Sequence, residues 1–202
     1  GSEAPLPNQM TALEALRTFD GNRYANFERL IVSNKSGKIR FAAAELMLEK
    51  AGVQKHETLA PLGKALLNGN SEERIDALAS AQELGRSAEN LCPIMLYMLK
   101  EDDEGLQMAA AEAIGSIAKR DDRTLHAVAA LLFEPEFVPY ASVALIRAGA
   151  SSTLPIVQSW NHTLPHDRLA GLAVLHALGE DAAAAGDALE EMATRTYERY
   201  PK

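Results

Sequence analysis

The sequence predicts an all-α protein that is built as a ladder of helix pairs. Three observations support this: the composition, a small residue that recurs in alanine-rich stretches, and two sets of markers that repeat about every 30 residues. Aromatic residues make up only 5% of the 202-residue chain, in which alanine and leucine are abundant. Alanine and straight-chain residues lose little conformational entropy in a helix, so this composition favours helices over strands.

The first set of markers closes the leading helix of each pair. Five alanine-rich stretches end, at spacings of 33, 33, 31 and 30 residues, at Gly52, Gly85, Ala118, Gly149 and Gly179. Eight residues before each end stands a small residue: Ala44, Ala77, Ala110, Ala141 and Gly171. Stacked helices approach to about 8–10 Å, so a small side chain indicates a crossing point. Glycine suits the helix C-cap, where the backbone turns left-handed.

The second set of markers opens the trailing helix of each pair. Capping residues recur at spacings of 32, 32, 30 and 29 residues: Thr58, Asn90, Asp122, Ser152 and Asp181. We expect their side chains to accept hydrogen bonds from the free amides of the first helical turn. The spacings of the two sets of markers are nearly equal and shorten together along the chain, which indicates an internal repeat.

These markers divide the chain into three parts. Gly1-Ser2 is typical of a tag remnant, and the rest of residues 1–7 is typical of a linker. A signal or anchor segment upstream of this linker is one possibility that the sequence suggests. Residues 8–36 read as a degenerate helix pair. Residues 37–199 hold five better-formed units, which we expect near 37–69, 70–101, 102–134, 135–164 and 165–199.

The repeat resembles the short bacterial type of HEAT-like repeat, which is also found in phycobilin lyases. The features that carry the resemblance are the small crossing residue, the closing Leu-Gly, and an arginine at the start of the leading helix, Arg74 and Arg168. The arginine is present in only two units, and the period is shorter than the ~40–47 residues of long HEAT units. The resemblance implies a right-handed α-α superhelix, or solenoid, of about five to six antiparallel helix pairs, with the trailing helices on its concave side.

One face of the trailing helices is the candidate binding surface. Helical periodicity sorts their positions into an inner set, expected in the core, and an outer set that is apolar in the middle units and polar at the ends. An apolar strip with polar rims suits a bound peptide. The candidate partner-binding residues are Lys64, Leu96, Tyr97, Lys100, Leu125, Val128, Leu132, Gln158 and His162. The alternative is that the apolar members are ordinary core.

Candidates for chemistry are weak. His162 and His166 have the spacing of metal ligands on a helix, but Pro165 between them breaks that helix. Cys92 is the only cysteine, so an intrachain disulfide is excluded. We expect its side chain to be a small buried hydrophobe. No phosphate-binding loop, nucleophile elbow or paired-cysteine site is present in the sequence, so we expect no catalytic residue, no metal and no cofactor.

These observations favour a non-enzymatic scaffold that binds a protein or peptide along the concave face. The alternatives are a phycobilin-lyase-like enzyme or accessory factor, and a HEAT-like DNA-binding protein. The net charge of −8 disfavours binding to a phosphate backbone. No apolar run approaches the ~18 residues that a membrane span needs, so we expect no direct insertion within this segment. The sequence leaves the partner, the oligomeric state and the compartment open, whether cytoplasmic or exported to the periplasm.

Overall fold

The computed structural model describes residues 11, 27–160, 168–187 and 190, and every regular element among them is a helix. The α-helices are α2 (Phe27–Ser33), α3 (Gly37–Lys50), α4 (Leu59–Asn68), α5 (Ser71–Leu84), α6 (Cys92–Met98), α7 (Glu104–Ile117), α8 (Asp122–Ala130), α9 (Val138–Ala148), α10 (Thr153–Ser159) and α11 (Leu169–Leu178). The short 3₁₀ helices are η2 (Val53–Lys55), η3 (Gly85–Leu91), η4 (Leu131–Phe133), η5 (Gly149–Ser152) and η7 (Gly179–Ala185). The all-α prediction is confirmed.

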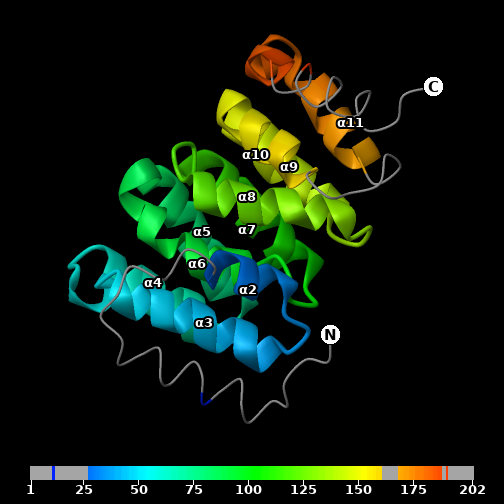
Figure 1. The fold of residues 1–202 in the computed structure, drawn as a ribbon. Coiled ribbons are helices and arrows are strands. Elements are labelled where there is room, and N and C mark those ends of the chain that lie inside the picture. Colours follow the sequence, from blue (N-terminus) through cyan, green and yellow to red (C-terminus); the bar gives the residue numbers. More distant parts are fainter. Residues whose placement is uncertain (1–10, 12–26, 161–167, 188–189, 191–202) are drawn as a thin grey trace.

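From α4 onward the helices alternate between two layers (Figure 1). The leading helices α5, α7, α9 and α11 pack in series to form one layer, and the trailing helices α4, α6, α8 and α10 form the other. Each trailing helix also packs against the leading helix that follows it in the chain. Within the described ranges, no helix is both long and apolar enough to cross a membrane.

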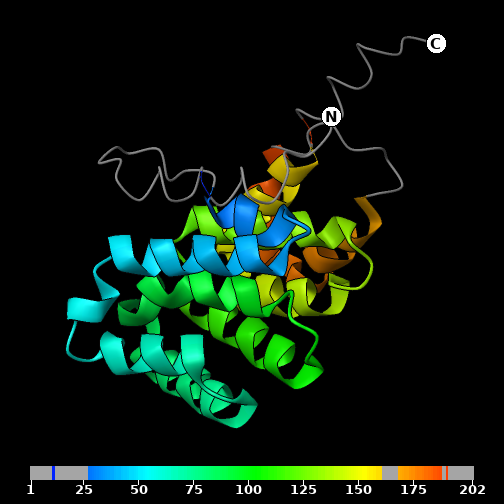
Figure 2. The ribbon, with the colours of Figure 1, turned by 90° about the horizontal axis from the view of Figure 1, so that it is seen from below.

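The first two described helices depart from this alternation. The main partners of α3 are α2 and α6, although its place in the predicted repeat would put it beside α5. Helix α2 packs against α3, α6 and α8, and Figure 2 shows it lying on top of the stack. The N-terminal helices therefore cover part of the trailing layer. Most of the predicted degenerate pair at 8–36 lies outside the described residues.

The predicted ends of the leading helices agree with the structure to within one or two residues. Four of the five closing residues are glycines with φ between 55° and 71°, the left-handed half of backbone space that glycine adopts without strain. The exception is Ala118, which closes α7 with φ −82°. The small residues eight positions earlier are all buried. A Cβ added at Gly171 would lie 2.7 Å from Cζ2 of Trp160, so no larger residue fits there.

The predicted caps of the trailing helices are wrong for the most part. Thr58 and Ser152 stand at the helix starts but make no side-chain capping hydrogen bond, and Asn90 and Asp181 lie inside η3 and η7. The cap of α8 is Asp121, one residue before the predicted one. At α6 and α10 the reason is that 3₁₀ turns lead directly into the helices, so carbonyls of those turns already accept from amides at the helix starts.

The core lies between the two layers. The trailing-helix positions predicted to face it are buried or half-buried: Leu62, Leu66, Ile94, Met95, Met98, Leu131, Ile156 and Val157. Helix α2 adds Ile31 and Val32, which are 0% and 1% exposed. The single cysteine, Cys92, is also fully buried, as expected for a small hydrophobe.

Candidate functional site

The apolar members of the predicted strip lie in the core. Leu96, Leu125 and Val128 are 0% exposed and Leu132 is 3% exposed. Helix α2 packs on α6 and α8, the helices that carry three of these residues. The alternative interpretation, ordinary core, therefore applies to these four side chains, because they belong to the apolar cluster that packs between the helices.

The polar members of the strip are dispersed. Lys64 on α4 and Gln158 on α10 are exposed. The Gln158 side-chain oxygen lies 2.6 Å from Nε2 of His126, whose Nδ1 lies 2.6 Å from the carbonyl oxygen of Asp122. His162 lies outside the described residues, as do His166 and Pro165 of the metal hypothesis.

Lys100 and Tyr97 are held by neighbours. The Lys100 ammonium donates to Oε2 of Glu134 at 2.5 Å and stands 4.3 Å from the centroid of the Phe137 ring, which leaves 9% of its side chain exposed. Tyr97 is half-buried, and its ring meets Phe41 edge-on with centroids 5.4 Å apart. Lys100 is therefore a structural cation and not a free charge at the rim of a groove.

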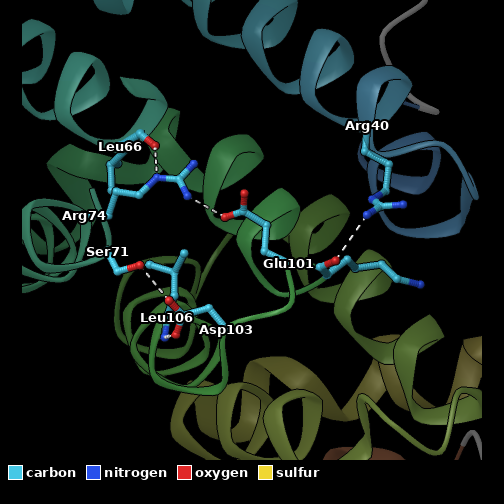
Figure 3. A network of polar contacts seen from close by, with 8 residues as sticks. Arg40, Leu66, Ser71, Arg74, Glu101, Asp103 and Leu106 are labelled. Atoms are coloured by element: carbon cyan, nitrogen blue, oxygen red, sulfur yellow. Dashed lines mark hydrogen bonds and ion pairs between the residues drawn. The ribbon is translucent and has the colours of Figure 1, made fainter. Parts of the chain in front are cut away.

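A network of polar contacts joins α3, α4, α5 and the turn between α6 and α7 (Figure 3). Nε of Arg74 donates to the Leu66 carbonyl at 2.9 Å, and its Nη1 donates to Glu101 at 2.7 Å. Nη2 of Arg40 donates to the Lys100 carbonyl at 3.1 Å. Arg74 thus satisfies a carbonyl at the C-terminal end of α4 and contacts the turn between α6 and α7, which is a structural role.

A pocket of about 490 Å³ lies where α2, the end of α3, the start of α6 and the start of α8 meet. We call it the α8 pocket. Its charged lining consists of Glu28, Lys50, Glu89, Arg120, Asp121, Asp122 and Arg123. Its other lining residues are Met47, Ala51, Asn90 and Pro93. With three basic and four acidic side chains, the fully ionised lining carries one net negative charge.

Glu28 is the unusual residue of the α8 pocket. Its side chain is only 4% exposed, and its Oε2 has no hydrogen-bond partner among the residues that the structure describes. Its Oε1 lies 3.7 Å from Nη1 of Arg123, too far for a hydrogen bond. Burial raises the pKa of Glu28, and a hydrogen bond from its own backbone amide and the charge of the nearby Arg123 only partly offset this. A buried carboxylate oxygen without a partner is energetically costly, so it marks a position at which a donor would be stabilising.

The second acidic group of the pocket has a structural role. Asp121 accepts hydrogen bonds from the backbone amide and the hydroxyl of Thr124 and so caps α8. Its side chain is 13% exposed. Cys92, nearby at the start of α6, is fully buried, and burial together with the charges of Asp121 and Glu89 raises its pKa well above the ordinary value. The thiol is therefore protonated and unsuited to nucleophilic chemistry.

Exposure distinguishes two groups of residues within the charged lining, apart from the half-buried Glu89 and the exposed Asp122. The acidic Glu28 and Asp121 are largely buried, and we call them the floor. The basic Lys50, Arg120 and Arg123 are exposed, and we call them the rim. Charges on the floor act in a lower dielectric than charges on the rim, so the floor has the larger effect on what binds.

Sequence reasoning did not identify this pocket. The signal that was available is the phase of α2: Glu28 shares one helical face with the core residues Ile31 and Val32. Among the described residues, no group of histidine, cysteine and acidic side chains is arranged to hold a metal. Comparisons of the chain with family models, with curated proteins and with solved structures find no match.

Proposed function

We propose that this protein is a HEAT-like solenoid that acts as a non-enzymatic interaction scaffold and binds a segment of another polypeptide at the α8 pocket. The proposed binding site lies at the N-terminal ends of trailing helices α6 and α8, and not along the centre of the trailing layer. The centre is occupied by α2, which packs on α6 and α8 in place of a partner.

The repeating arrangement of helices supports the scaffold part of the proposal. Leading and trailing helices each pack in series from α4 to α11, and left-handed glycines close four of the five leading helices. Stacks of this kind bury a continuous core and present the ends and loops of successive units side by side. The starts of α6 and α8, which line the pocket, belong to this stack, and α2 and the end of α3 complete the lining.

The observation that carries the binding part is the unpaired, buried carboxylate oxygen of Glu28 in a pocket of about 490 Å³. This volume lies in the range of ligand sites in proteins, about 300–1,000 Å³. It holds one or two side chains of a bound segment comfortably. The charged lining favours a polar segment over an apolar helix, because apolar groups would leave the floor unsatisfied.

The test is a peptide-display selection against the whole chain, followed by binding to two matched variants. Asn90 lines the pocket and is exposed, so the larger side chain of Asn90→Trp fills the pocket from its solvent side. Glu83 on α5 is exposed and is not part of the lining, so Glu83→Trp is the control. Both variants should unfold at the same urea concentration as the parent.

The expected result is that selected peptides bind the parent and Glu83→Trp but not Asn90→Trp. Selected peptides that bind all three proteins equally would place the interaction elsewhere and contradict the proposal. A selection that yields no binder at all would contradict the scaffold function itself.

A further inference from the structure

We propose that the α8 pocket recognises a basic side chain of the bound polypeptide, a guanidinium or ammonium group, and that Glu28 is the residue that accepts its hydrogen bond. This inference rests on the proposed function and specifies the chemistry of the partner.

The first argument is the state of the Glu28 carboxylate. It has two oxygens: Oε2 is unpartnered, and Oε1 lies 3.7 Å from the Arg123 guanidinium, too far for a hydrogen bond between these two groups. A carboxylate accepts hydrogen bonds and donates none when ionised. A charged donor satisfies it better than a neutral one, since charge-assisted hydrogen bonds are about twice as strong.

The second argument is charge. Glu28 is joined on the floor by Asp121, and the half-buried Glu89 and the exposed Asp122 add further negative charge. The whole chain carries −8, so a basic partner is also attracted at longer range. The opposing cations lie on the rim, where solvent screens them, and they suit the backbone carbonyls of the same bound segment.

The third argument is that the chain already places a guanidinium near this position. Arg123 reaches toward both Glu28 and Asp121, at 3.7 and 3.9 Å, while 60% of its side chain stays exposed. Neither contact is short enough for a hydrogen bond, and solvent screens the exposed guanidinium of Arg123. A better-placed cation can therefore displace the Arg123 side chain at a small cost in free energy.

The experiment uses the full chain, isotope-labelled for amide NMR, and three capped tripeptides. Acetyl-Gly-Arg-Gly-amide is the basic probe, acetyl-Gly-citrulline-Gly-amide is its neutral isostere, and acetyl-Gly-Glu-Gly-amide is the acidic counterpart. We expect saturable shifts at Asn90 and Arg123 with the arginine peptide. The citrulline peptide should bind about tenfold more weakly, because it replaces a charged donor by a neutral one.

The variants test the role of Glu28. Glu28→Gln keeps the shape and removes the charge, so the affinity for the arginine peptide should fall about tenfold. Glu83→Gln, outside the pocket, should leave the affinity unchanged. Arg123→Gln removes the competing guanidinium, so the arginine peptide should bind more tightly. Amide spectra of the free variants show whether each is folded.

Three results would overturn the inference: equal affinity for arginine and citrulline peptides, unchanged affinity in Glu28→Gln, or tighter binding of the glutamate peptide. The proposed function fails separately. If display-selected peptides lose binding to Asn90→Trp but tolerate Glu28→Gln, the pocket binds polypeptide and only its basic preference is refuted. If the arginine peptide binds through Glu28 but no selected polypeptide uses the pocket, the scaffold function is refuted and the cation site remains.

Discussion

Gly115 in α7 is a position where the packing of two leading helices leaves no room for a side chain. A Cβ added there would lie 2.6 Å from the carbonyl oxygen of Ala144 and 2.7 Å from Cβ of Arg147, both in α9. These atoms are fixed to the backbone, so a change of rotamer cannot relieve the overlap. Gly115→Ala therefore has to move α9 away from α7.

The magnitude follows from two opposing effects. Overpacking of this kind costs about 1–3 kcal/mol. Replacing glycine by alanine inside a helix returns about 1 kcal/mol through helix propensity. Because the overlap is with backbone, we expect the upper part of the first range and a net loss of about 1–2 kcal/mol. For a chain of this size, that lowers Tm by roughly 2–8 °C.

The assay is urea unfolding followed by circular dichroism, with Gly105→Ala as the matched control in the same helix. The contact that a Cβ at Gly105 would make is with Oδ1 of Asp103 at 3.4 Å, which is ordinary. We expect this variant to be at least as stable as the parent. If Gly115→Ala proves equally stable, the close approach of α7 and α9 is not a packing constraint, and the reasoning is refuted.

Four further predictions concern other parts of the fold. Ala110→Leu at the fully buried crossing position should cost about 1–3 kcal/mol in the same urea assay, and an unchanged midpoint would refute its placement. Burial raises the pKa of Glu28 above its ordinary value of 4.5, so its contribution to stability is full below that pH and is lost as the pH rises through the folded pKa. Glu28→Gln should therefore gain stability relative to the parent between acidic and neutral pH, which urea midpoints across that range will measure. Cys92 should not react with a thiol reagent in the native protein and should react in urea, because burial raises its pKa. Arg74→Met should lose about 1.5–3 kcal/mol, since the Leu66 carbonyl loses a charged donor; an unchanged midpoint would show that water replaces it.

The leading helices could be predicted from the sequence because their signals are local. A left-handed closing glycine, as at Gly85 or Gly149, and a small residue eight positions earlier act within one helix and at its crossing with the next. These signals fixed the helix ends to within one or two residues. They do not determine the superhelix, which depends on the angles between successive units.

The trailing helices were harder because a competing local structure satisfies their amides. Ser152 has the side chain of a cap, but its hydroxyl donates to the Gly149 carbonyl, and the 3₁₀ turn η5 supplies acceptors in its place. Composition alone does not distinguish a capping serine from one in a 3₁₀ turn. The predicted helix starts coincide with the observed ones at Thr58 and Ser152 and lie within one residue of them at Asn90 and Asp122.

The candidate site could not be predicted because it depends on contacts that are distant in the sequence. The face of α8 that carries Val128 looks like a groove until α2 is placed on it. The α8 pocket likewise needs Glu28 and Arg123 to meet. Helical periodicity shows that Glu28 shares a face with Ile31, but not what that face will contact.

The position of α2 against α8 has a consequence for how the chain folds during its synthesis on the ribosome. Glu28 and Arg123 are separated by 95 positions, so α2 leaves the exit tunnel long before the helix that will shelter it has been made. At synthesis rates of about 5–20 residues per second, the part of its surface that contacts α8 stays uncovered for several seconds, whereas α3 follows directly and can cover another part sooner. The contact between α2 and α8 is thus a late event in assembly, and chaperones that capture short amphipathic segments have time to bind α2 before it forms.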